Sequence, residues 1–157
     1  MDQANTDQAA LEAAQAALSG EHAAVYGYGV AGGHLEGARA AQAQEAYQAH
    51  RSRRDALERT VRELGGRPMA AAAGYRLPFP VTDADSAVRL AAELENRLAG
   101  VYADLVRAAS GALRGEAAAA LREAAVRSVR WQGDGVAFPG LAERAASAAP
   151  SSPAARS

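Results

Sequence analysis

The sequence contains no cysteine, lysine or isoleucine, and aromatic residues make up only 5% of its 157 residues. Without cysteine the chain has no disulfide, thiolate metal site, iron–sulfur cluster or cysteine nucleophile. The few aromatic residues and the absence of isoleucine disfavour sandwiches, barrels and parallel sheets. We therefore expect a protein that is built from helices.

Two further absences concern location and partners. The sequence has no run of about 18 apolar residues, and its polar, acidic N-terminus does not have the pattern of a secretory signal peptide. We therefore expect a cytoplasmic protein with no membrane partner. The net charge is -1, from 17 basic and 18 acidic residues, which gives no bulk attraction to nucleic acid. No nucleic-acid partner is expected.

Alanine is abundant, at 44 of 157 residues, and together with leucine, arginine, glutamate and glutamine it favours helices. Because alanine supplies much of the hydrophobic content, the core has few large side chains and the helices must lie close together. A chain of this length can bury enough surface to fold without a disulfide or a metal. We expect one domain over residues 1–147, with residues 138–141 folded back onto an open end of the core. Residues 148–157, rich in Ala, Pro and Ser, are expected to be a disordered tail.

Apolar residues recur at helical spacing in four segments. Gly65, Gly66 and Pro68 end the second segment, and Asp83 or Asp85 can cap the third. The four predicted helices cover about residues 8–32, 35–64, 83–110 and 114–132.

The lengths of the connections predict how these helices are arranged. Short turns make the first two helices antiparallel, and likewise the last two. The middle connection, residues 65–82, reaches roughly 60 Å when extended, whereas a helix of about 30 residues is roughly 45 Å long. It can therefore run the length of the bundle and make the second and third helices parallel, with Tyr75 and Phe79 covering the side of the bundle. One long crossover of this kind is typical of the all-α, ferritin-like four-helix bundle.

Three titratable residues lie at inward-facing positions of the first three predicted helices: Glu21, His50 and Glu95. A carboxylate buried alone would be costly, so a neighbouring cation or metal is expected beside each one. Arg54, one turn after His50, is the cation nearest to it in the sequence. We predict a buried polar network of Glu21, His50, Arg54 and Glu95.

The same residue types occur in metal centres. Di-iron bundles use a Glu from each of two helices and Glu-x-x-His from each of two others. Here Tyr47 stands three residues before His50, and no His lies three residues after Glu123. A complete di-iron site is therefore not expected, and no cofactor is predicted. One Fe, Mn or Zn ion bound by Glu21, His50 and Glu95 is the alternative.

The segment 27–32 matches the pattern G-x-G-x-x-G, but it lies inside a predicted helix, so nucleotide binding is not expected. We interpret the small residues of this region as a surface that permits close approach of another helix. The predicted result is a homodimer through a flat face of four residues: Ala23, Tyr26, Gly27 and Ala31. His22 lies about 100° around the helix from Glu21, which places it at the core edge or in a dimer contact.

Six blocks of the sequence, in order between about residues 9 and 141, resemble an actinobacterial ferritin-like domain family of unknown function. The blocks are EHAAVYGYG at 21–29, HRSRRDAL at 50–57, YRLPFPV at 75–81, LE at 94–95, RW at 130–131 and FPGL at 138–141. The resemblance implies a four-helix ferritin-like fold and no established activity. It also implies family positions at Glu21, His50, Arg54 and Glu95, without a second Glu-x-x-His.

These observations together predict a ferritin-like binding or interaction module that is not an enzyme. Its buried polar residues would form a structural network rather than a di-iron site. The alternative is a single-metal enzyme or metal-handling protein that uses Glu21, His50 and Glu95.

Overall fold

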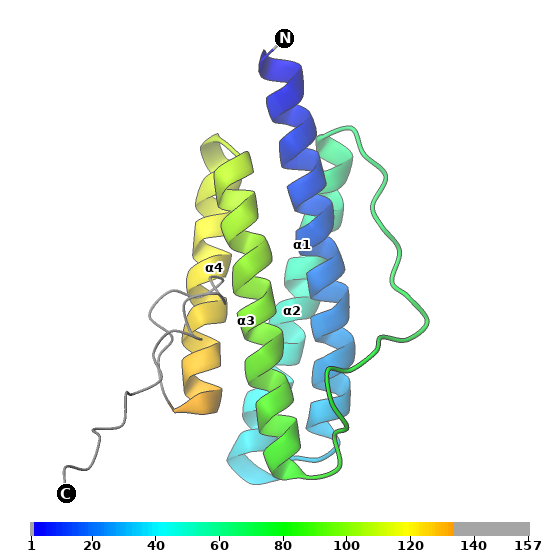
Figure 1. The fold of residues 1–157 in the computed structure, drawn as a ribbon, viewed down its shortest axis with the longest axis vertical. Coiled ribbons are helices and arrows are strands. Elements are labelled where there is room, and N and C mark those ends of the chain that lie inside the picture. Colours follow the sequence, from blue (N-terminus) through cyan, green and yellow to red (C-terminus); the bar gives the residue numbers. More distant parts are fainter. Residues whose placement is uncertain (1, 134–157) are drawn as a thin grey trace, which may run out of the picture.

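The computed structural model describes residues 2–133. This part of the chain is all-α and forms a four-helix bundle (Figure 1). The helices are α1 (Asp2–Gly32), α2 (Gly37–Glu63), α3 (Ala84–Ala108) and α4 (Gly111–Gln132).

The helix ends lie within a few residues of those predicted, except at the start of α1. The prediction began this helix near residue 8, whereas the structure begins it at Asp2. Residues 4–7 are exposed, so they carry no apolar periodicity that could have revealed this part of the helix. Asp83 caps α3 as expected: its carboxylate accepts a hydrogen bond from the Ser86 backbone N–H at 2.8 Å, and Ser86 Oγ accepts one from the Asp83 N–H at 3.1 Å.

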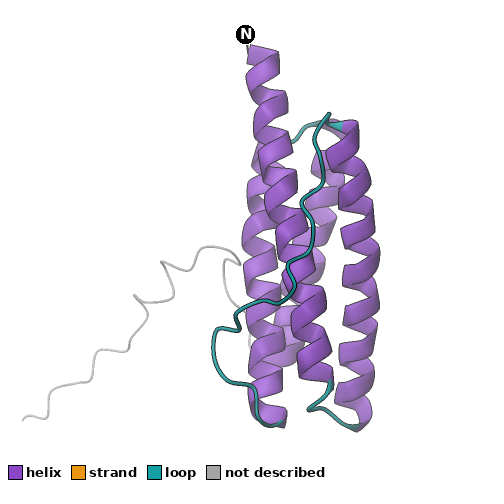
Figure 2. Cartoon of the chain, turned by 90° about the vertical axis from the view of Figure 1, so that its right-hand side faces the viewer, coloured by secondary structure: helices purple, strands orange, loops and turns teal. Residues whose placement is uncertain are grey.

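The connections confirm the predicted topology. α1 and α2 form one antiparallel hairpin, and α3 and α4 form the other (Figure 1). Between them, residues 64–83 run the length of the bundle and make α2 and α3 parallel (Figure 2).

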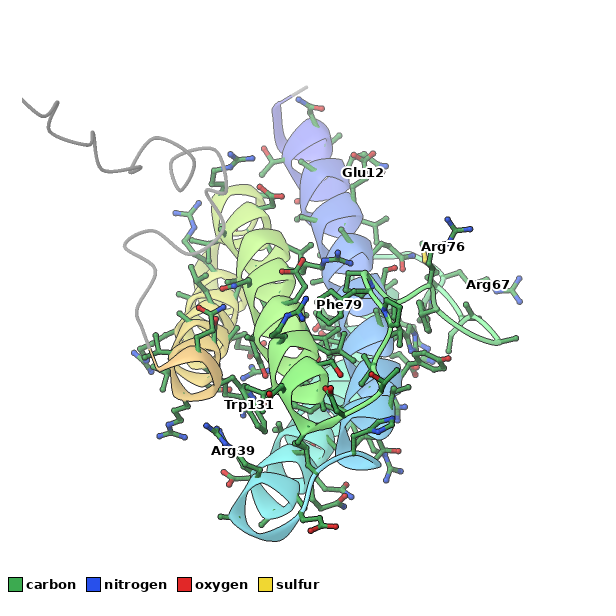
Figure 3. All side chains as sticks on the ribbon, turned by 60° about the horizontal axis from the view of Figure 1, so that its bottom comes forward. Glu12, Arg39, Arg67, Arg76, Phe79 and Trp131 are labelled. Carbon is green, nitrogen blue, oxygen red and sulfur yellow. The ribbon has the colours of Figure 1, made fainter. Side chains whose placement is uncertain are left out.

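Side chains of α1 hold the long crossover against the bundle. The Gln15 amide donates to the Arg67 carbonyl at 2.6 Å and accepts from the Met69 N–H at 3.0 Å. His22 Nε2 lies 3.0 Å from the Met69 carbonyl oxygen, and the ring of Tyr26 contacts that of Tyr75. His22 therefore helps to hold the crossover against α1. The side chains of Arg67 and Arg76, which also belong to the crossover, point away from the helices (Figure 3).

α4 is attached to the bundle mainly through α3. α3 also packs along α1, and α1 packs along α2. α2 and α4 are linked by long side chains: Arg53 pairs with Glu123 at 2.5 Å, and Arg39 donates to the Arg130 carbonyl at 3.1 Å. The Arg39 guanidinium also lies over the ring of Trp131, 5.1 Å from its centroid (Figure 3).

The core consists of two apolar clusters with polar residues between them. The first cluster includes Leu18, Val61 and Leu105, in the half of the bundle where α2 ends and α3 ends. The second includes Leu90 and Trp131, in the half with the α1–α2 turn. Between the two clusters lie buried polar side chains, one from each helix, which we call the polar layer: Glu21, His50, Glu95 and Ser128.

The face predicted to form a dimer is largely used inside the chain. A Cβ atom added to Gly27 would meet Leu94 Cδ1 of α3 at 2.5 Å, and Ala31 is fully buried in the second cluster. These residues allow α1 and α3 to approach closely, and Tyr26 contacts the crossover. The expectation of a free surface is therefore wrong for Gly27 and Ala31, whereas Tyr26 remains 39% exposed. The dimer itself stays a prediction.

Two other expectations, the folding back of residues 138–141 and the tail at 148–157, lie outside the described residues. Segment 27–32, with its G-x-G-x-x-G pattern, lies within α1, as expected. No helix in the described part of the chain combines the length and apolar character needed to cross a membrane.

Candidate functional site: a buried glutamate–histidine–glutamate cluster

The centre of the polar layer is a cluster of Glu21, His50 and Glu95, which we call the acid–histidine cluster. α1, α2 and α3 each contribute one of these residues at an inward position. His50 lies between the two carboxylates: its Nδ1 is 2.7 Å from Glu21 Oε2, and its Nε2 is 2.9 Å from Glu95 Oε1. The side chains expose 1%, 3% and 0% of their surface, in sequence order, so all three are removed from solvent.

Two tyrosines extend the cluster in a crosswise arrangement. Tyr28, two turns after Glu21 on α1, donates its hydroxyl hydrogen to Glu95 Oε1 of α3 at 2.6 Å. Tyr102, two turns after Glu95 on α3, donates to Glu21 Oε1 of α1. Each helix therefore supplies a carboxylate and a tyrosine seven residues later. Because α1 and α3 are antiparallel, each tyrosine reaches the carboxylate of the other helix.

Trp131 connects α4 to this arrangement. Its indole Nε1 donates to the Tyr28 hydroxyl oxygen at 2.9 Å, and the Tyr28 ring stacks on the His50 ring with centroids 5.3 Å apart. The result is one continuous chain of hydrogen bonds that includes side chains from all four helices: Trp131, Tyr28, Glu95, His50, Glu21 and Tyr102.

His50 is held in its protonated form. Burial alone lowers the pKa of this imidazole, but the hydrogen bonds to Glu21 and Glu95 and the charges of these carboxylates raise the pKa to about 9. At neutral pH both ring nitrogens therefore carry hydrogen and donate to the carboxylates. The imidazolium acts as a cation between two acidic groups.

The tyrosines remain neutral donors. Burial raises the pKa of Tyr28 and of Tyr102 above the ordinary value, and the carboxylate beside each one raises it further. Glu95 Oε1 thus accepts from both His50 and Tyr28. Its other oxygen, Oε2, has no hydrogen-bond partner, and among the described residues it is the one buried side-chain polar atom in this condition.

Arg54 is not part of the network, which corrects the prediction. Its guanidinium donates to Asp55 Oδ1 at 2.7 and 2.9 Å at the surface of α2. Four residues rotate a helix by about 40° beyond a full turn. Arg54 therefore lies at the edge of the face that buries His50 and Leu57, and its side chain is 24% exposed. The carboxylates of Glu21 and Glu95 are stabilised without Arg54, because the His50 imidazolium and the tyrosine hydroxyls already donate hydrogen bonds to them.

Tyr28, Tyr102 and Trp131 belong to the observed network, although the predicted network did not include them. The signal for the tyrosines was present as an identical spacing, Glu followed by Tyr after seven residues, in two helices. Trp131 offered no comparable signal, because its partner Tyr28 lies 103 residues earlier in the chain.

The residues of the acid–histidine cluster do not fit a metal centre in the arrangement observed. A metal-bound imidazole must offer a nitrogen lone pair, whereas both nitrogens of His50 face carboxylate oxygens. Glu123, the α4 glutamate that lacks a His three residues later, pairs with Arg53 at the surface. Within residues 2–133, no group of three or more His, Asp or Glu side chains is arranged to hold a metal ion.

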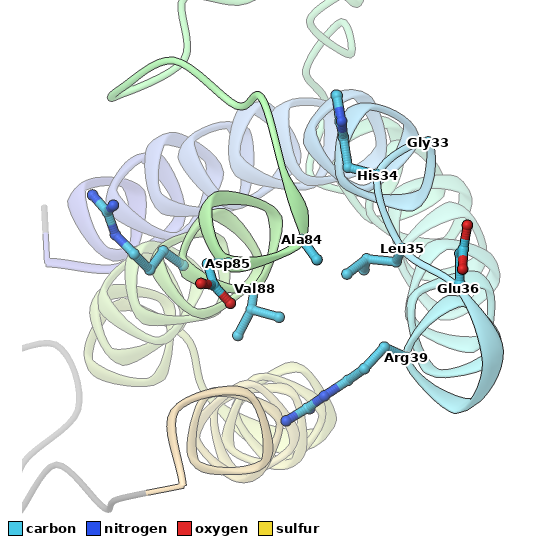
Figure 4. A pocket seen from close by; sticks show the side chains of 9 residues that line it. Gly33, His34, Leu35, Glu36, Arg39, Ala84, Asp85 and Val88 are labelled. Atoms are coloured by element: carbon cyan, nitrogen blue, oxygen red, sulfur yellow. The ribbon is translucent and has the colours of Figure 1, made fainter.

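A hollow of about 920 Å³ lies at the end of the bundle where α1 turns into α2 (Figure 4). His34, Leu35 and Glu36 come from the turn, Arg39 extends from α2 toward α4, and Asp85 lies on the first turn of α3. A second hollow, of about 500 Å³, lies beside Tyr28 and Tyr47. Neither is lined by a residue of the acid–histidine cluster.

The tyrosine hydroxyls should contribute measurably to stability. Replacing Tyr102 by phenylalanine removes a donor to buried Glu21, and leaving a buried acceptor without its partner costs about 1–3 kcal/mol. For a chain of this size we expect the melting temperature to fall by about 5 °C, measured by circular dichroism. Tyr47→Phe is the matched control, since no hydrogen bond of the Tyr47 hydroxyl is found among the described residues. Equal melting temperatures for the two variants would contradict the role assigned to Tyr102.

The comparisons with known proteins agree with this fold. The solved structure of a conserved hypothetical protein from Mycobacterium tuberculosis, rv2844, is similar to this chain, with 37% identity and a TM-score of 0.76 over 82% of this chain and 96% of that chain. No curated protein matches the chain. The family model described as Domain of unknown function (DUF4439) matches residues 13–143. Because this match spans most of the sequence, the chain belongs to the family described as Domain of unknown function (DUF4439).

Proposed function

We propose that this chain is a ferritin-like bundle of the actinobacterial type, in which a protonated histidine takes the place of a metal centre, and that it acts as a non-catalytic binding module. The observation that carries the proposal is the position of His50, with both ring nitrogens bonded to the carboxylates of Glu21 and Glu95. The imidazolium supplies the positive charge that two buried carboxylates require.

The burial of the acid–histidine cluster supports a structural role. A catalytic acid or base must come within hydrogen-bond reach of its substrate, whereas Glu21, His50 and Glu95 are almost completely enclosed. Their hydrogen-bonding groups, apart from Glu95 Oε2, are already used within the protein. The cluster joins the helices, and the helix surfaces remain for contacts with other molecules.

A single-metal protein is the second candidate, and one atom favours it. Glu95 Oε2 is buried and has no hydrogen-bond partner, so its lone pair is available to coordinate a metal ion. A metal would then require His50 to lose a proton and to give up one of its carboxylate contacts. This competition between the metal and the proton of His50 favours the metal-free form at neutral pH.

Metal content and metal-dependent stability test the proposal. The chain purified without a chelator should contain well below one metal ion per molecule by elemental analysis. Addition of EDTA, or of Fe²⁺, Mn²⁺ or Zn²⁺, should leave the melting temperature unchanged. A site filled at 100 times its Kd would add about 2.7 kcal/mol, which would raise the melting temperature by about 8 °C.

The variant Glu95→Gln separates the two candidates. A metal-induced rise in melting temperature that is present in the parent and absent in Glu95→Gln would establish the single-metal protein. The metal-free proposal requires both chains to be insensitive to all three ions.

A further inference from the structure

Within residues 2–133, α4 packs against the bundle with one side. Its buried residues follow one stripe: Ala117, Ala120, Ala124, Ser128 and Trp131. That stripe faces α3, while α2 reaches α4 through long side chains. Away from the stripe, Val126 and Val129 expose 45% and 39% of their surface, one turn apart. α4 therefore presents a second apolar surface to solvent.

The two valines belong to a shallow hollow of about 290 Å³ between α4 and α3, which we call the α4 hollow. Its lining residues are Asn96, Arg122, Ala125, Val126, Ser128, Val129 and Arg130. Ser128 Oγ donates to Asn96 Oδ1 at 2.9 Å, so these polar groups bond to each other. The hollow thus offers an apolar surface of Ala125, Val126 and Val129.

Two arginines flank the hollow. Arg122 and Arg130 are exposed, and neither has a carboxylate partner within residues 2–133. By contrast, Arg53, Arg97 and Arg107 each pair with an acidic residue. The two free guanidiniums are eight residues apart on α4, about 12 Å along the helix axis. They match carboxylates seven or eight residues apart on another helix.

We propose that the α4 hollow binds an acidic amphipathic helix of another protein. The apolar face of the partner covers Val126 and Val129, and its carboxylates pair with Arg122 and Arg130. This is helix-in-groove recognition, in which apolar residues supply contact area and charges fix the orientation. The inference names a partner for the proposed binding module, but it does not depend on the state of His50.

The charges favour such a partner over a second copy of this chain. A two-fold dimer brings the same patch of both subunits together. The α4 hollow contains Arg122 and Arg130 and no carboxylate, so two copies would place only positive charges at the contact. An acidic partner removes this repulsion.

A labelled peptide tests the proposal on the full chain. The probe is a fluorescein-labelled helical peptide of about 15 residues, with leucines on one face and glutamates seven or eight residues apart beside them. Fluorescence anisotropy should show binding that weakens as salt is added. The double variants R122E/R130E and V126D/V129D should each bind at least about tenfold more weakly, a change of about 1.4 kcal/mol.

Two controls keep the test specific. Arg107→Glu makes the same charge change as each single replacement in R122E/R130E, at an arginine that is 81% exposed on α3. It should change the affinity less than about twofold, well below the tenfold loss above. A probe with lysines in place of the glutamates should not bind. Helix content by circular dichroism should be equal in all variants, because the replaced side chains are exposed.

The proposal is overturned if the glutamate probe does not bind, if the lysine probe binds equally well, or if Arg107→Glu weakens binding as much as R122E/R130E. It is also overturned if sedimentation shows a dimer of the parent that V126D/V129D dissociates, because a second copy then covers the hollow. The assay is carried out with EDTA present. Metal found in the purified chain would contradict the metal-free proposal and leave the peptide result to be judged separately.

Discussion

Replacing His50 by alanine should lower the melting temperature by about 10 °C or more. The variant leaves Glu21 and Glu95 buried without the cation between them, and breaking a buried charge network by removing one partner costs about 3–5 kcal/mol. In a protein of this length, each kcal/mol corresponds to about 2–4 °C. Thermal unfolding followed by circular dichroism at pH 7 measures the effect.

His34→Ala is the matched control, because His34 lies in the exposed turn before α2 and should leave the melting temperature within about a degree. A second comparison tests the physical cause. If the cost arises from uncompensated carboxylates, the triple variant Glu21→Leu, His50→Leu and Glu95→Leu should be more stable than His50→Ala, since apolar residues can replace a buried ion network. It should not reach the stability of the parent, because the Tyr28 and Tyr102 hydroxyls lose their acceptors. A His50→Ala variant as stable as the parent would refute the assigned role.

Stability should fall as the pH rises from about 6.5 to about 9. His50 has a pKa of 6.5 when unfolded and about 9 when folded, so over this range the folded chain keeps a proton that the unfolded chain loses. The stabilisation is complete below the unfolded pKa and is lost as the pH passes through the folded pKa. At 1.36 kcal/mol per pKa unit, the loss is on the order of 3 kcal/mol.

Urea unfolding at several pH values measures this dependence, and His50→Gln supplies the control because glutamine does not titrate. The difference in unfolding free energy between parent and variant should be greatest below pH 6.5 and should shrink toward pH 9. The buried tyrosines do not interfere, since burial and the neighbouring carboxylates raise the pKa of both above the ordinary value. A constant difference across this pH range would show that His50 does not carry the extra proton.

Most of the fold follows from local features of the sequence. Apolar spacing located the four helices, and the length of segment 65–82 was enough to predict a crossover along the bundle. The start of α1 escaped prediction because residues 4–7 are exposed and follow no apolar stripe. The free surface expected at Gly27 and Ala31 is absent for a different reason. Small residues signal close helix approach, but they do not say which helix approaches, and for Gly27 it is α3 of the same chain.

The site was predictable only in part. Inward spacing identified Glu21, His50 and Glu95, because a titratable residue at an inward position interrupts the pattern of apolar residues. Their partners depend on which helices are neighbours: the crosswise contacts of Tyr28 and Tyr102 require α1 and α3 to be antiparallel and adjacent. Arg54 was chosen because it is near His50 in sequence, whereas the bonding partners observed are far apart along the chain.

The polar layer also bears on how these helices find a unique alignment. The inward faces of these helices carry alanine in many successive turns, so sliding one helix past another by one turn would change the apolar contacts little. A shift of this kind would move Glu21 or Glu95 away from His50 and into an apolar cluster, at the cost of an unpaired buried charge. The layer thereby selects one axial register, as single polar residues do in coiled coils. We expect the triple leucine variant to remain folded but to occupy several registers, visible as broadened or multiplied amide signals in its NMR spectrum.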